Sequence, residues 1–483
     1  MTAGKKGNGG AGSRAGAIAG AQLYFDSGAF LEDLARRVAI PSASQEPEHK
    51  GALGDYLERE MRPAFEALGF KCRVLANPTG AGPFLVAERR EGAGLPTLFS
   101  YGHGDVIRGQ DAEWRHGLSP WTLTVEGDRI YGRGTADNKG QHTINMGALA
   151  AVLRARGRLG FNAVFLIETG EEVGSPGLRE VILANRALFA ADLLIASDGP
   201  RLGPDKPTIF MGARGALNFD LTVKLREGAH HSGNWGGLLA NPGILLAHAL
   251  ASMVGPRGQI LLPELKPKAV PDSVRDALAD CEIEGGPDAP LIDTWWGEPG
   301  LSPAEKVYAW NTFEVLAFKT GNPDRPVNAI PATASAHCQI RFTVDTDPKA
   351  FLPAIATHLN KHGLAQVKVA QARDGYFEAT RLDPKHPTAV WAAESVQRTT
   401  NAKPSMLPNL GGSLPNELFA DLLGLPTIWV PHSYASCSQH APNEHMLVPV
   451  AREGLRIMAG LFWDLGEGKL PKGGAAKANR RAA

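Results

Sequence analysis

The chain has 483 residues, about three times the length of a typical single domain, so two or more folded units are expected. Its 50 Lys and Arg residues balance its 50 Asp and Glu residues, which leaves no net charge to attract nucleic acid or an anionic membrane. Hydrophobic residues make up 43% of the chain and charged residues 21%, as in ordinary globular proteins, which excludes a chain that is disordered throughout.

The cysteines and the two ends of the chain favour a cytoplasmic protein. The four cysteines are scattered without a CxxC pair, so the sequence indicates neither a disulfide framework nor a cysteine zinc site. No run reaches the roughly 20 apolar residues of a membrane-spanning helix. Residues 1–20 and 467–483 are rich in Gly, Ala, Lys and Arg, which predicts a disordered leader and a disordered basic tail.

Between these ends, short apolar runs alternate with amphipathic stretches, which is the pattern of an α/β protein. Apolar residues return every three or four positions in two stretches, 30–40 and 51–70, and predict helices there. Apolar runs that end in polar residues predict strands at 98–101, 163–167, 193–197 and 427–430. Because chemistry in an α/β sheet collects just past the strand ends, the polar residues that follow these runs are candidate site residues.

From about residue 215 the pattern changes to strand, helix, strand, helix, which predicts a small α+β sandwich inserted into the larger unit. We therefore predict an α/β fold whose large domain, residues 21–213 and 380–466, has a mixed central sheet flanked by helices. The inserted α+β sandwich covers residues 214–379. Within it, the stretch 255–325 is too long for a simple turn and predicts an elaborated loop or an extra sheet element.

The first polar cluster is His103-Gly104-Asp105, at the end of a predicted strand. In an extended chain, residues i and i+2 point to the same side, so Asp105 can accept the second N–H of the His103 imidazole. A carboxylate in this position orients a metal-binding histidine. Taken alone, the pair is also compatible with an ordinary solvated or buried contact.

The second cluster is the glycine-rich stretch GRGTADNKG, residues 132–140. Its glycines suit a tight loop, and Asp137 precedes a stretch that predicts a helix. A helix cap is one interpretation of Asp137. A nucleotide-binding loop is disfavoured, because Asp137 stands where the GxGxxG pattern requires its third glycine.

The third cluster places two adjacent carboxylates, Glu171 and Glu172, just past an apolar strand. Adjacent side chains diverge, so one can bind a metal ion while the other reaches a water molecule; an exposed surface pair is the alternative. Asp198 ends the next apolar run, and His440 lies in the loop after the late strand. Such a set of histidines and carboxylates suits two metal ions that share one carboxylate.

The ordered motifs HGD, GRGTADNKG, ETGEEVGS, SDGP, HHSG, NAIP and QHAPNE resemble the M20 family of dinuclear metallopeptidases, and most nearly its carnosinase-like and dipeptidase-like branch. The resemblance extends over roughly residues 25–465. It implies two divalent metal ions per chain, Zn²⁺ with Mn²⁺ or Co²⁺ as alternatives. The resemblance implies that His103 and Asp198 bind one ion and that Glu172 and His440 bind the other, with Asp137 bridging both ions.

The resemblance also implies roles in catalysis. Glu171 matches the general base, and Asp105 matches the carboxylate behind the first histidine. His231 falls where the family has a lid histidine that reaches across a homodimer interface and stabilises the oxyanion of the partner's site. A purely structural lid histidine is the alternative. The insert at 214–379 is thereby expected to be a lid and dimerisation domain.

Further matches concern the substrate. Asn328 and Arg341 match lid positions that hold the substrate's carbonyl or carboxylate, with a salt bridge inside the lid as the alternative for Arg341. The loop Gly411-Gly412-Ser413 resembles the family's glycine-rich substrate loop. That loop often begins with Arg, whereas Asn409 stands here, so the resemblance does not carry over the substrate contacts of that Arg.

We therefore predict a metal-dependent hydrolase that cleaves the amide bond of a small substrate such as a dipeptide, through water activated by two metal ions and Glu171 as general base. One alternative on the same fold is an amidohydrolase of N-acyl amino acids, N-carbamoyl compounds or aromatic amides. The sequence also does not distinguish a dipeptidase from a carboxypeptidase. A non-catalytic paralogue is disfavoured because every ligand and the base are present. The G-x-S-x-G elbow and the HExxH helix of other hydrolases are absent.

Overall fold

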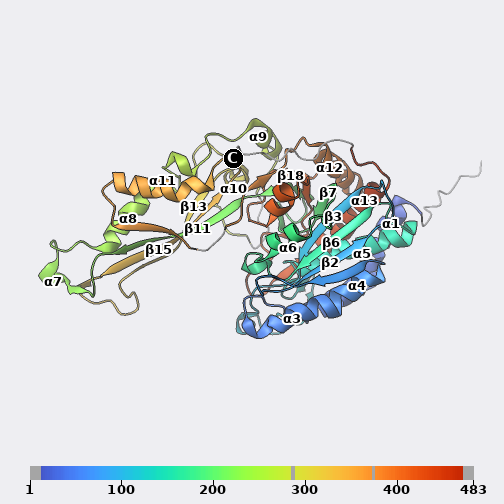
Figure 1. Ribbon diagram of the computed structural model, residues 1–483, viewed down its shortest axis with the longest axis horizontal. Helices are drawn as coiled ribbons and strands as arrows, with labels where there is room; N and C mark the ends of the chain where they lie inside the picture. Colours follow the sequence, from blue (N-terminus) through green and yellow to red (C-terminus); the bar gives the residue numbers. More distant parts are fainter. Residues whose placement is uncertain (1–11, 284–288, 373–375, 472–483) are drawn as a thin grey trace, which may run out of the picture.

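The computed structural model describes residues 12–283, 289–372 and 376–471. Figure 1 shows two lobes, one built around an eight-stranded sheet and the other around a four-stranded sheet. Within these residues, none of the helices combines the length and the hydropathy needed to cross a membrane.

The larger sheet has the strand order β1-β2-β6-β3-β7-β19-β9-β18. Its centre is parallel: β3 (Thr97–His103) pairs with β6 (Asn162–Glu168) and β7 (Leu193–Ala196), and β7 pairs with β19 (Thr427–Trp429). These are the four strands predicted from the apolar runs, and their carboxyl ends lie at one edge. The other strands make the sheet mixed, as predicted: β1 (Lys71–Leu75), β2 (Phe84–Arg89), β9 (Thr208–Phe210) and β18 (Ser405–Leu407).

Helices cover both faces of this sheet, because its strands are apolar on both sides. Along β6, Phe165 and Ile167 belong to one buried cluster and Val164 and Leu166 to the other. The first face packs against α1 (Arg14–Asp26), α2 (Ala29–Val38), α5 (Lys139–Arg156), α12 (Pro387–Thr400) and α13 (Val448–Gly466). The second face packs against α6 (Leu178–Ala184), α9 (Asp272–Leu278) and α10 (Pro303–Tyr308).

The stretch predicted as a disordered leader, 1–20, differs from the structure in its second half. Helix α1 begins at Arg14, and its small residues Ala17 and Ala21 are buried against α5 and α13. The Arg14 guanidinium also pairs with Asp464 of α13, with Nε 3.0 Å from Oδ1. Composition alone missed this helix because it buries small side chains instead of large ones. Residues 1–11, and the predicted tail from 472 onward, lie outside the described residues.

The smaller lobe is the predicted α+β sandwich. Its antiparallel sheet has the order β13-β15-β11-β16, and alternate residues of the central strand β11 (Gly215–Lys224) are buried. Helices α8 and α11 pack on this sheet. The remaining elements of the sandwich are β13 (Thr312–Thr320), β15 (Thr333–Phe342), β16 (Val367–Gln371), α8 (Pro242–Met253) and α11 (Pro348–Lys361).

The stretch 255–325 joins the two lobes. Leu262 and Leu265 pack with the smaller sheet, whereas α9, α10 and Trp310 pack in the second core of the larger sheet. Part of the region predicted as one inserted unit, 214–379, therefore contributes to the core of the larger lobe. The chain passes between the lobes through β10 (Gly212–Ala213) and β17 (Thr380–Arg381), which pair with each other.

Several shorter elements accompany the two lobes. A helical segment precedes β1 and consists of α3 (Lys50–Asp55), a π-helix (Tyr56–Met61) and α4 (Arg62–Ala67). Small strand pairs and one three-stranded sheet flank the lobes: β4 (Thr124–Glu126), β5 (Arg129–Tyr131), β8 (Pro200–Arg201), β12 (His230–His231), β14 (Ala329–Ile330), β20 (Ser433–Tyr434) and β21 (His445–Leu447). A single-turn helix, α7 (Ser232–Trp235), follows β12.

Candidate active site

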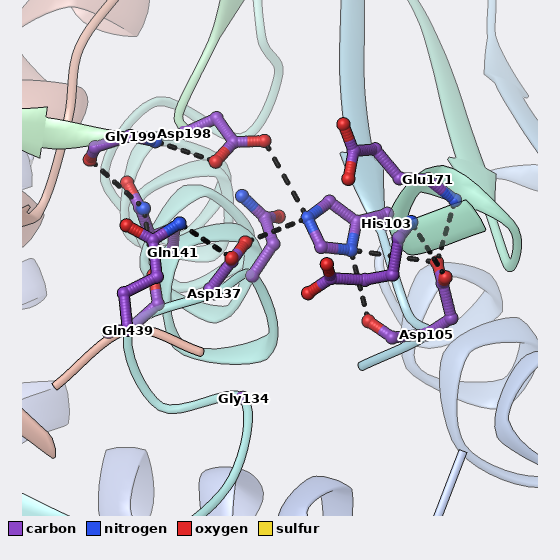
Figure 2. Close-up of polar contacts among 12 residues, drawn as sticks. His103, Asp105, Gly134, Asp137, Gln141, Glu171, Asp198, Gly199 and Gln439 are labelled. Carbon is purple, nitrogen blue, oxygen red and sulfur yellow. Dashed lines mark hydrogen bonds and ion pairs between the residues drawn. The ribbon is translucent and has the colours of Figure 1, made fainter. Parts of the chain in front are cut away.

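Three predicted metal ligands meet at the carboxyl ends of β3 and β7 (Figure 2). His103 is the last residue of β3 and only 1% exposed; its Nε2 lies 2.9 Å from Asp137 Oδ1 and 3.7 Å from Asp198 Oδ2. Asp198 Oδ1 accepts the backbone N–H of Gly199 at 2.6 Å. Among the described residues, nothing donates a hydrogen bond to the buried Oδ2. A buried, unsatisfied carboxylate oxygen beside an imidazole nitrogen and a second carboxylate fits a divalent cation.

The second group shares Asp137 with the first. His440 Nε2 lies 3.0 Å from Asp137 Oδ2 and 3.0 Å from Glu172 Oε2. The two oxygens of Asp137 therefore face two different histidines, Oδ1 toward His103 and Oδ2 toward His440. Within each group the candidate ligand atoms lie within 4.8 Å of one another. The structure thus brings all five predicted metal ligands together, in two groups that have Asp137 in common.

Asp105 is buried behind His103. Its backbone carbonyl lies 3.0 Å from His103 Nδ1, and because a carbonyl only accepts, Nδ1 carries the proton and Nε2 is free to bind a cation. The Asp105 carboxylate accepts the backbone N–H groups of Glu171 and Glu172, each at 3.1 Å. Asp105 therefore connects the first histidine to the loop that holds the two adjacent carboxylates.

Glu171 and Glu172 begin a short 3-10 helix, Glu171–Val173, that follows β6. Their side chains diverge as expected for neighbouring residues. Glu172 contacts His440, whereas Figure 2 shows the Glu171 carboxylate beside His103 and directed away from Asp105. A carboxylate near both groups but outside the ligand set is suited to proton transfer.

The charges in this cluster shift several pKa values. Burial, followed by the charge of Asp137, raises the pKa of Glu172 to about 7 and that of Asp198 to about 6. Burial also raises the pKa of Glu171 well above its usual range. Hydrogen bonds with Asp137 and Glu172 raise the pKa of His440 to about 11. Protons and divalent cations compete for such residues, because carboxylate and imidazole groups bind metal only when deprotonated.

Residues 99–464 match the sequence model of peptidase family M20/M25/M40. The chain belongs to this family. It is 24% identical over 403 residues to the Beta-Ala-His dipeptidase of Rattus norvegicus, covering 79% of this chain and 80% of the relative. It is 26% identical over 399 residues to the cysteinylglycine-S-conjugate dipeptidase of Corynebacterium striatum, covering 80% and 84%. The structure of the dipeptidase Dug1p from Saccharomyces cerevisiae has the same fold, with a TM-score of 0.76, 20% identity, and coverage of 95% and 99%.

Family membership makes the protein a metallohydrolase that cleaves peptide-type amide bonds and depends on divalent metal ions. The mixed sheet flanked by helices is the architecture of the M20 dipeptidase structures. These findings confirm the predicted family, fold class and enzyme class.

The structure brings Arg341 together with the glycine-rich loop of this M20 peptidase. Ser413 Oγ accepts a hydrogen bond from Arg341 Nη1 at 3.0 Å and donates one to the Arg214 carbonyl at 2.7 Å. Arg214 Nε in turn donates to the Gly411 carbonyl at 2.9 Å, one residue before Gly412. In the described part of the chain neither guanidinium forms an ion pair with a carboxylate, so the lid salt bridge considered for Arg341 is not found there.

Asn409, which stands where the family often has Arg, forms hydrogen bonds within the protein. It is fully buried, and its side-chain amide donates to the carbonyl of Thr380 and, at 3.4 Å, to that of Ala213. These two carbonyls belong to β17 and β10, the strands through which the chain passes between the lobes. Asn409 thus links both crossing strands to the glycine-rich loop.

His231 and Asn328 lie together, but not beside the buried cluster. His231 is exposed, and its Nδ1 accepts the N–H of Gly233 at 3.1 Å. The Asn328 carbonyl accepts the N–H and the O–H of Ser232 at 2.9 and 3.1 Å. Figure 1 shows α7, which begins at Ser232, at the far end of the smaller lobe. Within one chain these two predicted residues therefore lie away from the carboxyl ends of the large sheet.

Sequence reasoning missed two residues that hold Asp137. Gln439 Nε2 donates to Asp137 Oδ2 at 2.6 Å, and Glu444 accepts the backbone N–H of Asp137 at 3.1 Å. Both flank His440 in the QHAPNE motif, from which only the histidine received a role. Polar residues within a few positions of a candidate ligand in the same loop were the available signal.

Proposed function

We propose that the protein is a dipeptidase that works with two divalent metal ions. Zn²⁺ is the metal we propose, with Mn²⁺ or Co²⁺ as alternatives. The observation that carries this proposal is the orientation of Asp137, whose two oxygens face two separate groups of candidate ligands. His103 and Asp198 would hold one ion, and Glu172 and His440 the other. One imidazole nitrogen and carboxylate oxygens at each position suit these metals. The relatives named above are dipeptidases.

When bound at these residues, divalent ions would polarise the scissile carbonyl and lower the pKa of water. Glu171 accepts the proton of the attacking water and gives it to the leaving amine. Its buried position near both ligand groups, which raises its pKa, makes the protonated form a competent donor. Asp105 keeps Glu171 in place through the backbone N–H and holds the His103 ring in the orientation that leaves Nε2 free.

Arg341 and Ser413 are proposed to bind the substrate's terminal carboxylate. A guanidinium pairs with a carboxylate through two parallel hydrogen bonds, and Arg341 has no carboxylate partner among the described residues. Burial lowers the pKa of Arg214, beside the same loop, to about 9, and the charge of Arg341 adds to this shift. Among the described residues neither guanidinium forms an ion pair with a carboxylate, although the charge of Glu314 acts on Arg214, and two neighbouring positive groups favour an anionic ligand. The loop Gly411-Gly412-Ser413 would supply the remaining contacts.

We further propose that the protein forms a homodimer through the lid. Strand β13 lies at the edge of the smaller sheet, and Val315, Leu316 and Phe318 on it are 45%, 54% and 45% exposed. A long apolar edge strand is a surface on which another chain pairs. In such a dimer His231 and Asn328 would approach the partner's metal site and contact the substrate's carbonyl. The unpaired state of the four cysteines is consistent with the cytoplasm, which we propose as its location.

The test combines metal analysis with a substrate panel on one purified sample, before and after chelation and metal restoration. We expect close to two metal ions per chain and cleavage of dipeptides that chelation abolishes and metal restores. Preferential cleavage of N-acyl amino acids, N-carbamoyl compounds or aryl amides would identify the alternative amidohydrolase. Bound metal without any cleavage would favour a non-catalytic paralogue. Absence of bound metal would overturn the proposed site.

A further inference from the structure

Glu444 is a buried carboxylate that lies against the loop carrying Asp137. It is 1% exposed, and its Oε1 accepts three backbone N–H groups, from Gly134 at 3.0 Å, Ala136 at 3.0 Å and Asp137 at 3.1 Å. Gly134 has a positive φ of 88°, which lets the loop turn its N–H groups toward one point. N–H groups of one loop that converge in this way form an anion-binding site similar to a backbone nest, here filled by the protein's own side chain.

The charge of Glu444 is compensated locally. Its Oε2 lies 2.8 Å from Arg133 Nη1, and the Arg133 side chain is also only 1% exposed. Arg133 Nη2 donates to the side-chain carbonyl of Gln110 at 3.0 Å. Because Arg133 and Glu444 neutralise each other, Glu444 adds no net negative charge to a cluster that already contains an excess of carboxylates. Its contribution to the cluster is therefore geometric.

The hydrogen bond from the backbone N–H of Asp137 to Glu444 does not involve a candidate metal ligand. The hydrogen bonds and ion pairs of the Asp137 carboxylate involve His103, His440 and Gln439, which are candidate ligands or the neighbour of one. Glu444 instead holds the main chain on the amino-terminal side of Asp137. It also lies four residues after His440, so one short segment supplies a ligand of the second group and the anchor for the shared residue.

We propose that Glu444 is a positioning residue that orients Asp137, so that its two oxygens face the two metal positions before metal binds. This inference rests on the proposed role of Asp137 as the shared ligand. Because Asp137 belongs to both groups, a loss of this orientation weakens binding at both positions. A ligand that contacts only one ion would affect one position.

The chain offers a matched control in Glu91. Its Oε1 and Oε2 accept the backbone N–H groups of Leu159 and Gly160, each at 2.8 Å, and its Oε1 pairs with Arg89 Nε at 2.9 Å. The chemistry is the same: a carboxylate that holds loop N–H groups and an arginine. The contact lies just before β6 begins, at the opposite end of the strand from the metal cluster. Glu91→Gln therefore measures how the loss of such a contact affects stability and Zn²⁺ affinity when the contact does not hold Asp137.

The experiment is a competition titration with Zn²⁺ and a chromophoric chelator on metal-stripped full-length protein. It compares the natural chain with Glu444→Gln, Glu444→Asp and Glu91→Gln, and urea unfolding of each metal-stripped sample measures stability. We expect both Glu444 variants to bind Zn²⁺ about 10 to 100-fold more weakly at both positions, the usual range for residues that orient metal ligands. Glu91→Gln should retain both affinities.

Glu444→Asp separates positioning from charge, because it keeps the negative charge beside Arg133 but is too short to reach all three N–H groups. It also carries the test if Glu444→Gln does not fold. Zn²⁺ affinities within twofold of the natural chain in the folded Glu444 variants would overturn the inference. Failure of the natural chain to bind two Zn²⁺ ions would instead overturn the proposed function, so the two failures are distinguishable.

Discussion

The two regions that contain the predicted site residues are built in opposite ways. At the carboxyl ends of the large sheet, His103, Asp137 and Asp198 are at most 5% exposed, and buried contacts fix their orientation. At the tip of the smaller lobe, His231 and Asn328 are exposed and rest on a two-residue strand pair. The five candidate metal ligands therefore come together within one chain, whereas His231 and Asn328 would need either a large movement or a second chain to reach that cluster.

The largest expected effect concerns the buried region. Glu171→Gln removes the proposed general base while leaving the size of the side chain and the backbone N–H bonded to Asp105 unchanged. We expect kcat to fall by about 10² to 10⁴-fold, the usual contribution of general acid and base catalysis, with bound metal unchanged. Steady-state kinetics and metal analysis on the same sample measure this. Near-native turnover with full metal content would show that another group transfers the proton.

The next effect tests whether the lid acts on a second chain. His231→Ala should lower kcat by about 10² to 10³-fold, as expected for loss of one donor to an oxyanion, without changing metal content. When His231→Ala and Glu171→Gln subunits are mixed and allowed to exchange, each mixed dimer should regain one intact site. About a quarter of the natural activity should return, because half of the dimers are mixed and half of their sites are intact.

The mixing experiment distinguishes the two explanations of the distant lid. If His231 served the site of its own chain, every site in the mixture would carry one defect and no activity would return. Sedimentation of the natural chain provides the control. A fully active monomer would remove both the proposed dimer and the proposed role for the partner's His231.

A smaller effect is expected at the base of the lid. Arg341→Met removes the proposed carboxylate partner, so we expect KM for dipeptides to rise about 10 to 100-fold, in line with a hydrogen bond to a charged group, with a smaller change in kcat. The matched control is Arg226→Met, since Arg226 also lies in the smaller lobe and donates to backbone carbonyls, of Pro331 and Ala240. An equal rise in KM for both variants would indicate a general effect on the lid.

The difference between the regions also explains what the sequence could predict. Apolar runs that end in polar residues located β3, β6, β7 and β19, and the edge where they end, because buried parallel strands have a simple pattern. The identities of the ligands came from the ordered motifs. Which side chains meet could not be predicted from spacing alone, since Asp137 and His440 are 303 residues apart.

Other features depend on tertiary contacts that leave a weak local pattern. Helix α1 buries alanines, which resemble a flexible leader in composition. Glu444 has the sequence character of an ordinary loop residue, and only the folded loop at Gly134 reveals its three N–H partners. The stretch 255–325 divides its apolar residues between two cores, so no single periodicity describes it.

The smallest expected effect is the pH dependence of stability after metal is stripped. In the folded chain the pKa of Glu172 is raised to about 7 from 4.5, and that of Asp198 to about 6 from 3.8, chiefly by burial. Between about pH 5 and 7 the folded state therefore binds more protons than the unfolded state, and the free energy of unfolding falls as pH rises. His440, which is half-exposed, acts in the same direction. The raised pKa of His103 adds to this slope, whereas the lowered pKa values of the buried His142 and His432 oppose it near pH 6.5, and that of Asp137 opposes it at more acidic pH.

Urea unfolding at pH 5.5, 6.5 and 7.5 should therefore show a loss of about 1 kcal/mol or more in the metal-stripped protein, since one pKa unit corresponds to about 1.4 kcal/mol. With Zn²⁺ present the slope should reverse, because the ion binds the deprotonated ligands and binding to the folded state adds stability. His231→Ala should leave both slopes unchanged, since the exposed tip does not contact the cluster. Parallel slopes with and without Zn²⁺ would mean that protons and metal do not compete for the same carboxylates.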